Sequence, residues 1–104
     1  MSAADLLKRL PQALNADAAA GLDCTIQFAC TEPAHAQIRD GRCVMSTGTN
    51  TNPDVTITMD DDDLVALLKG ELNGMSAFMQ GKLQIDGDLQ LAQRLPALFD
   101  ADKL

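Results

Sequence analysis

An alternation of apolar and polar residues that begins at Leu22 is the feature that most constrains how this chain folds. The even-numbered residues from 22 to 30 are Leu, Cys, Ile, Phe and Cys, and the polar residues Asp23, Thr25 and Gln27 stand between the first four of them. Because successive side chains of a strand point to opposite faces, this period of two predicts a strand with one buried face and with Gln27 turned outward. The same extended backbone rules out a disulfide between Cys24 and Cys30, since six strand residues span about 20 Å and bridged Cα atoms lie within about 7 Å.

A hairpin is predicted around Asp40-Gly41, a dipeptide favoured in two-residue turns between antiparallel strands. Residues 34–39 and 42–47 flank this turn and supply its two strands. The register then places Ile38 opposite Cys43 on the core face.

Further elements follow from this period of two and from the helical period of about 3.6 residues. Residues 55–59 and 83–86 alternate again and predict two more strands. Apolar residues at helical spacing, opened by capping residues or restarted by proline, predict helices elsewhere. These are Ala3–Leu14 with a restart at Pro11, a turn capped by Asn15, a helix opened by Asp60 to Asp63, one capped by Asn73 that runs to Gln80, and one capped by Asp88 with a restart at Pro96. The order of elements predicts an α+β fold, and the length of 104 residues predicts one domain over residues 1–104.

Composition excludes several classes of function. Fifteen acidic residues against eight basic ones give a net charge of −7, which is a poor match for a nucleic acid backbone. Three phenylalanines are the chain's only aromatic residues, so stacking platforms for bases are lacking. No apolar run approaches the roughly 18 residues of a membrane span, and the mixed charges of residues 1–10 predict neither a signal peptide nor an anchor. We therefore expect a cytoplasmic protein that makes at most transient membrane contact, through a local basic or apolar surface.

Candidates for catalysis and metal binding are scarce. His35 is the one histidine and is predicted on the solvent face of a strand. Cys24, Cys30 and Cys43 fall in strands, which favours buried, reduced thiols; a small enzyme using one of them is the competing interpretation. The run Asp60–Asp63 lacks the spacing of a calcium loop and suits a helix start, where the dipole favours acids. We expect no catalytic residues, no metal and no cofactor.

Two motifs stand out in the segment from Pro53 to Leu95. Residues 53–59 read PDVTITM and residues 76–89 read SAFMQGKLQIDGDL, and the stretch 91–95 continues the pattern. With these motifs the segment resembles the sterol carrier protein 2 family. This resemblance implies a five-stranded, mostly antiparallel sheet covered on one face by helices, with an apolar tunnel between the layers. It also implies a non-enzymatic protein that binds fatty acids, fatty acyl-CoA, sterols or other lipids.

The tunnel can be assigned residues by their positions in the predicted elements. For each of them, packing in the core competes with contact to a ligand. Gln80, beside Phe78 and Met79 in the family motif, can hydrogen-bond a lipid head group or else satisfy carbonyls at the end of its own helix. The predicted lipid-binding residues are Ile57, Leu64, Leu67, Leu68, Met75, Phe78, Met79, Gln80, Leu83, Leu95, Leu98 and Phe99.

Two interpretations of function remain besides a cysteine enzyme. The first is a lipid carrier, whose partner is a hydrophobic small molecule. The second is an accessory protein that presents a hydrophobic substrate, such as a quinone, to a partner enzyme. The ending Asp102-Lys103-Leu104 shares two residues with a peroxisomal targeting tripeptide but has Asp where a small residue is expected, so we expect no targeting role.

Overall fold

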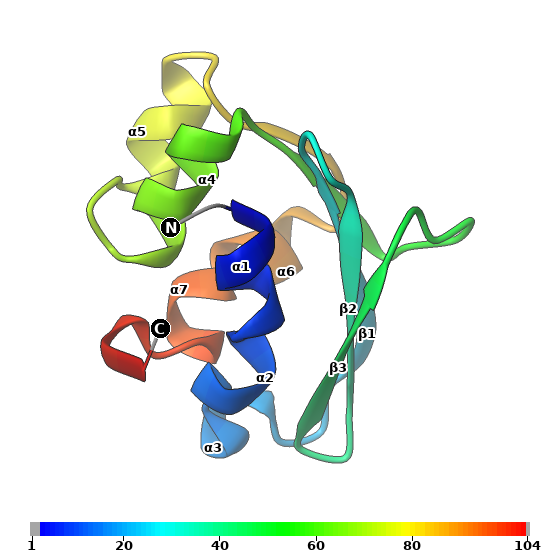
Figure 1. Cartoon of the computed structure of the whole chain (residues 1–104). Helices are drawn as coiled ribbons and strands as arrows, with labels where there is room; N and C mark the ends of the chain where they lie inside the picture. Colours follow the sequence, from blue (N-terminus) through cyan, green and yellow to red (C-terminus); the bar gives the residue numbers. More distant parts are fainter. Residues whose placement is uncertain (1–2, 104) are drawn as a thin grey trace.

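The computed structural model describes residues 3–103; Leu104, the last residue of the C-terminal tripeptide, lies outside the described residues. Figure 1 shows a curved sheet with the helices gathered on one side of it. The strands are β1 (Asp23–Ala29), β2 (Ala34–Arg39), β3 (Arg42–Thr47), β4 (Val55–Thr58) and β5 (Gln84–Gly87). The helices are α1 (Ala3–Lys8), α2 (Leu10–Ala13), α3 (Ala16–Ala19), α4 (Asp61–Leu68), α5 (Gly74–Met79), α6 (Leu89–Gln93), α7 (Leu95–Leu98) and the 3-10 helix η1 (Ala101–Lys103).

The five strands form one sheet in the order β3-β2-β1-β4-β5. β1 and β4 run parallel, and the other neighbouring pairs are antiparallel. In the hairpin Ile38 lies opposite Cys43, and Asp40 takes the positive φ of 56° that its turn requires. The predicted α+β fold and the predicted hairpin register are confirmed.

The helices bury one face of the sheet. Ile26 and Phe28 of β1 and Ile38 of β2 are fully buried there. α2 packs against β3 and α6 against β4. The N-terminal and C-terminal helical segments are also joined, because Asn15 N–H donates a hydrogen bond of 2.7 Å to the Leu98 carbonyl. The core therefore lies between the sheet and a single layer of helices.

Local signals in the sequence set several helix boundaries as predicted. Pro11 lies in the first turn of α2 and Pro96 in the first turn of α7, so each proline restarts a helix. The Asn15 side chain accepts hydrogen bonds from the N–H groups of Asp17 and Ala18 and so caps α3.

Asp60 departs from the cap that the sequence predicts. It stands at the N-cap of α4, but its side chain makes no capping hydrogen bond. Asp61 instead accepts a hydrogen bond of 3.0 Å from Thr31 N–H, which joins the first turn of α4 to the end of β1. The prediction of a side-chain cap was wrong, although the acids do lie where the helix dipole favours them.

Gln27 also differs from its expected exposure. It points to the outer face of the sheet, yet it is only 2% exposed, because the loop after β3 covers it. Its amide nitrogen donates to the carbonyls of Ala34 at 3.2 Å and Gly48 at 3.3 Å, and its oxygen accepts from Asn50 N–H at 2.7 Å. A buried amide needs such partners, and here they anchor the loop. The alternation correctly predicts the direction of the Gln27 side chain, but it does not predict the loop that covers it.

Candidate functional site

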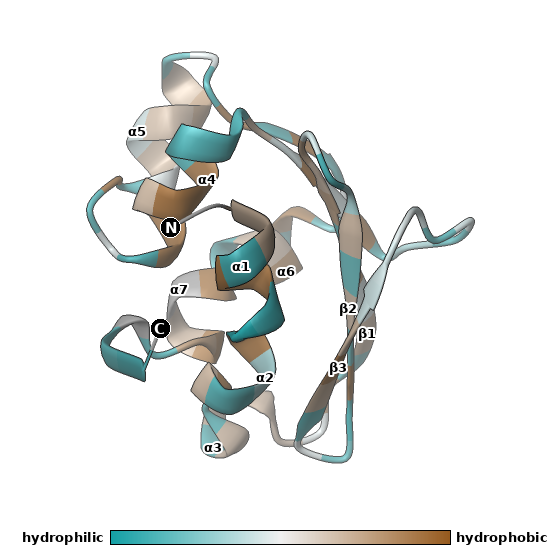
Figure 2. Cartoon of the chain, in the orientation of Figure 1, coloured by the Kyte–Doolittle hydropathy of each residue, from teal (hydrophilic) through white to brown (hydrophobic). Residues whose placement is uncertain are grey.

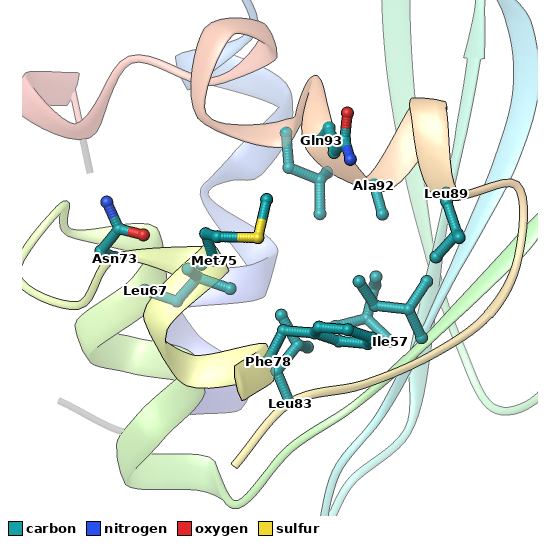
Figure 3. A pocket seen from close by; sticks show the side chains of 12 residues that line it. Ile57, Leu67, Asn73, Met75, Phe78, Leu83, Leu89, Ala92 and Gln93 are labelled. Atoms are coloured by element: carbon teal, nitrogen blue, oxygen red, sulfur yellow. The ribbon is translucent and has the colours of Figure 1, made fainter. Parts of the chain in front are cut away.

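A cavity of about 370 Å³ lies between the sheet and the helices α4 to α7. Figure 3 shows the side chains that converge on it from both layers. Ile57 of β4 and Ile85 of β5 face each other across the strand pair and form its sheet side. Its lining consists of Ile57, Leu67, Asn73, Gly74, Met75, Phe78, Leu83, Ile85, Leu89, Ala92, Gln93 and Leu95. We call this cavity the main pocket.

The position of α5 on the main pocket is fixed by its N-terminal cap and by one small buried residue. Asn73 Oδ1 accepts a hydrogen bond of 3.1 Å from Ser76 N–H. Ala77 is fully buried, and its carbonyl accepts from both Lys82 N–H and Leu83 N–H, which turns the chain back into β5. This arrangement leaves Phe78 facing the pocket.

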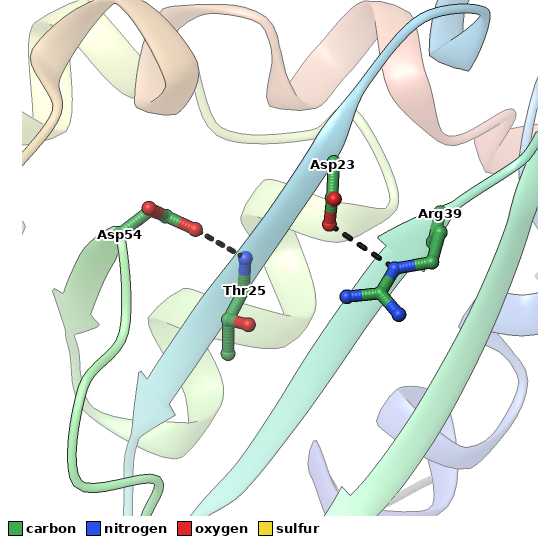
Figure 4. A network of polar contacts seen from close by, with 4 residues as sticks. All are labelled: Asp23, Thr25, Arg39 and Asp54. Carbon is green, nitrogen blue, oxygen red and sulfur yellow. Dashed lines mark hydrogen bonds and ion pairs between the residues drawn. The ribbon is translucent and has the colours of Figure 1, made fainter.

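The position of α6 is fixed by Asp88 and Asp54. Asp88 Oδ1 caps the helix by accepting from Leu91 N–H at 3.1 Å, and Asp88 N–H donates to the Asp54 carbonyl at 3.0 Å. The Asp54 side chain accepts from Thr25 N–H at 2.7 Å, as drawn in Figure 4. Asp54 therefore ties β1, β4 and the start of α6 together. The neighbouring Asp23–Arg39 pair is well exposed and adds little stability.

The chemistry of the main pocket is apolar. Of the described residues that line it, none is charged, and Asn73 and Gln93 supply its side-chain polar groups. Figure 3 shows these two amides apart from the apolar group around Ile57 and Phe78. An unpaired charge would be costly among such side chains, whereas an apolar chain gains by leaving water. The pocket suits a hydrophobic ligand whose polar group can lie near the amides.

The predicted lipid-binding residues fall into four groups. Ile57, Leu67, Met75, Phe78, Leu83 and Leu95 line the main pocket. Leu64 and Leu98 are buried in the core, and Met79 and Gln80 are exposed outside the lining. Leu68 and Phe99 line a second cavity of about 280 Å³, which we call the second pocket. Leu67 and Leu95 line both pockets and so stand between them.

Half of the lining was missed by the sequence reasoning. Ile85 shares a strand face with Leu83, so the period of two was a signal for it. Leu89, Ala92 and Gln93 lie three and four residues apart, which is helical spacing on one face of α6. Asn73 and Gly74 gave no such signal beyond the predicted cap.

The cysteines and the histidine lie away from the main pocket. All three cysteines are free thiols, and Cys24 and Cys43 are buried on either side of Ile38. Burial raises the pKa of Cys43 to about 11, with a smaller contribution from nearby Cys24. Burial also raises the pKa of Cys24 and of Cys30, so these thiols stay protonated at neutral pH and are poor nucleophiles.

Residues 3–103 contain neither a helix that could span a membrane nor a cluster of metal ligands. None of the described helices is both long enough and apolar enough to cross a bilayer. Within the same residues, no group of three or more His, Cys, Asp or Glu side chains is placed to hold a metal ion.

The sequence profile of the SCP-2 sterol transfer family matches residues 3–100, which is nearly the whole chain. This chain belongs to the SCP-2 sterol transfer family. SCP-2 domains bind or transfer hydrophobic lipids, and the resemblance seen in the sequence is confirmed.

The SCP-2 domain has relatives that are much longer proteins. It is 47% identical over 64 residues to peroxisomal multifunctional enzyme A of Dictyostelium discoideum, covering 62% of this chain and 14% of that protein. It is 43% identical over 61 residues to sterol carrier protein 2 of Rattus norvegicus, covering 59% of this chain and 11% of that protein. The SCP-2 domain thus occurs within enzymes as well as in carriers.

Solved structures share the fold of this SCP-2 domain. The sec-alkylsulfatase Pisa1 from Pseudomonas sp. superposes with a TM-score of 0.80 at 25% identity, over 88% of this chain and 15% of that chain. Palmitated SCP2L2 from Aedes aegypti superposes with a TM-score of 0.74 at 23% identity, over 91% of each chain.

Proposed function

We propose that residues 1–104 act as one non-enzymatic lipid-binding domain that carries a single long-chain lipid, such as a fatty acid, a fatty acyl-CoA or a sterol-like molecule, in the main pocket. The observation that carries this proposal is the uncharged lining of a 370 Å³ cavity between sheet and helices. This volume lies within the range of small-molecule sites. The free thiols, two of them buried, support a reducing, cytoplasmic compartment.

The expected affinity follows from the apolar area that the lipid buries. An acyl chain of about fourteen methylenes gains on the order of 11 kcal/mol at roughly 0.8 kcal/mol each, before the cost of ordering the chain. Dissociation constants from micromolar to tens of nanomolar are consistent with that gain.

Displacement of a fluorescent fatty acid from the purified protein tests this function, together with native mass spectrometry for a lipid that co-purifies. We expect saturable binding of one probe per chain at micromolar protein. The absence of both probe displacement and a co-purified lipid would refute the function.

A continuous tunnel is the finer form of this proposal. The main pocket and the second pocket share Leu67 and Leu95 as the wall between them. Leucine side chains change rotamer without moving the backbone, so a long chain passes between the two residues and reaches the second pocket. The longest chain that binds fully then depends on whether these two leucines let it pass.

Replacing Leu67 by alanine should extend the range of chain lengths that bind. In the wild type, affinity should rise with each methylene until the main pocket is filled and then rise more slowly, because the two leucines must change rotamer to let the chain pass. In Leu67→Ala, further methylenes should continue to add up to about fourfold in affinity each, because the wall is open. Competition by a series of fatty acids of increasing length measures this. Leu72→Ala, a half-buried leucine outside both linings, is the matched control, and an identical dependence on chain length in Leu67→Ala and wild type would contradict the tunnel.

Presentation of a hydrophobic substrate to a partner enzyme is the second candidate. It is supported by the presence of related SCP-2 domains inside longer enzymes, where they form about one seventh of the chain. Weak binding of free fatty acids, together with recovery of an enzyme in stoichiometric amount with the tagged protein, would favour this candidate over a carrier.

A further inference from the structure

Exposed large apolar side chains gather at one place on the described part of the protein. Met75, Phe78 and Met79 of α5 are 56%, 46% and 80% exposed, and Leu89 of α6 is 52% exposed. We call these four residues the rim. Val44 of β3, on the outer face of the sheet, is the other strongly exposed apolar residue among those described.

The rim is continuous with the main pocket. Met75, Phe78 and Leu89 line the pocket and are also open to solvent, and Figure 3 shows them around its interior. Met79 extends the same surface outward without lining the pocket. An apolar path therefore leads from the surface of α5 into the cavity.

The N-terminal helices offer no comparable surface. Leu6, Leu7 and Leu10 are at most 1% exposed, so the apolar faces of α1 and α2 are already packed in the core. Among the described helices, α5 thus carries most of the apolar surface that faces water.

We propose that the rim docks on the surface of a lipid bilayer and sets the mouth of the main pocket against it. This inference rests on the proposed function, because a carrier must take its lipid from the phase that holds it. A chain that slides from bilayer to pocket along the rim avoids contact with water, which would otherwise cost its hydrophobic free energy.

The size of the rim favours a bilayer over a second copy of this chain. Four half-exposed side chains offer on the order of 400 Å² of contact area. A stable protein interface needs about 800 Å² from each partner. A bilayer interface has no such threshold, since each apolar side chain that enters it contributes separately.

Local charge is also compatible with a lipid surface. The chain carries −7 overall, but residues 69–89, which contain the whole rim, hold two lysines, Lys69 and Lys82, against three acids, Glu71, Asp86 and Asp88. Figure 2 shows α5 in pale colours and the acidic first turn of α4 in teal. The segment that contains the rim therefore has a net charge of −1, so anionic lipid has no electrostatic advantage and neutral, zwitterionic lipid is the surface we expect.

Co-sedimentation with phosphatidylcholine vesicles tests the docking, using Met79→Asp and the matched control Val44→Asp. Both positions are exposed and lie outside the main pocket, so both variants should fold, as their thermal midpoints will show. We expect the partition coefficient of Met79→Asp to fall about tenfold or more, because a methionine side chain that enters the bilayer is replaced by a charged one. The control should stay within about twofold of the wild type. Met79→Ser serves as a second variant and should weaken partitioning in the same direction.

Binding of a fluorescent fatty acid in water, without vesicles, separates this inference from the function on which it rests. Both Asp variants should bind the probe like the wild type. Equal partitioning of Met79→Asp and wild type, or a wild-type dimer that Met79→Asp dissociates, would overturn the docking while leaving lipid binding intact. If the wild-type protein does not bind the probe in water, the proposed function itself is refuted.

Discussion

Replacing Ala92 by tryptophan is expected to weaken lipid binding about a hundredfold or more while leaving the fold in place. Ala92 lies on the side of α6 that faces the main pocket, and its methyl group points into the cavity (Figure 3). An indole at this position occupies space that the ligand chain needs. Excluding about four methylenes at roughly 0.8 kcal/mol each lowers affinity about a hundredfold or more. Displacement of a fluorescent fatty acid measures the loss.

Gln90→Trp is the matched control for this variant. Gln90 is an exposed residue of the same helix and lies outside the lining of the main pocket. It should retain wild-type affinity, and both variants should unfold near the wild-type temperature. Wild-type affinity in a folded Ala92→Trp protein would place the ligand elsewhere.

Replacing Gly87 by alanine should strongly destabilise the protein. Gly87 has a φ of +113°, which residues with a side chain rarely adopt, and it lies opposite Val55 in the β4–β5 pair. A Cβ atom here would clash with the Asp54 carbonyl oxygen and lie 3.0 Å from Val55 Cα, and neither backbone atom can move freely. We expect a loss of about 3 kcal/mol or more in the free energy of unfolding, since backbone strain and steric overlap add.

Thermal and denaturant unfolding measure this effect, with Gly21→Ala as the control. Gly21 has a φ of +78°, but nothing lies within 4 Å of a Cβ atom built there. Strain alone should cost it about 1–2 kcal/mol. Similar losses in the two variants would contradict the close approach of β5 to Asp54.

Most strands could be predicted because their signals are local. The alternation in β1 and the Asp-Gly turn between β2 and β3 each lie within a few residues, and the hairpin register follows directly. The parallel pairing of β1 with β4 joins segments about 30 residues apart, and no local pattern specifies it. Gln27 was misjudged for the same reason, since a distant loop buries it.

The main pocket could be predicted only in part. Residues with large apolar side chains in the family motif, such as Phe78 and Leu83, do line it. Leu64 and Leu98 are equally apolar and also lie at helical spacing, but they pack in the core. Periodicity identifies which face of an element points inward, and it does not show where that face leaves a cavity. Ala92 was missed because a small residue carries a weak hydrophobic signal, although its small size leaves room for the cavity.

Methyl NMR of the wild-type protein during titration with a long-chain fatty acid tests the central claim most directly. The account predicts saturable shifts at one ligand per chain for the methyl groups of Ile57, Ile85, Leu89 and Ala92, which surround the main pocket. The methyl groups of Val44, on the outer face of the sheet, should stay unchanged. Shifts confined to residues outside the pocket, or no saturable shift at all, would contradict the claim that the pocket between sheet and helices is the lipid site.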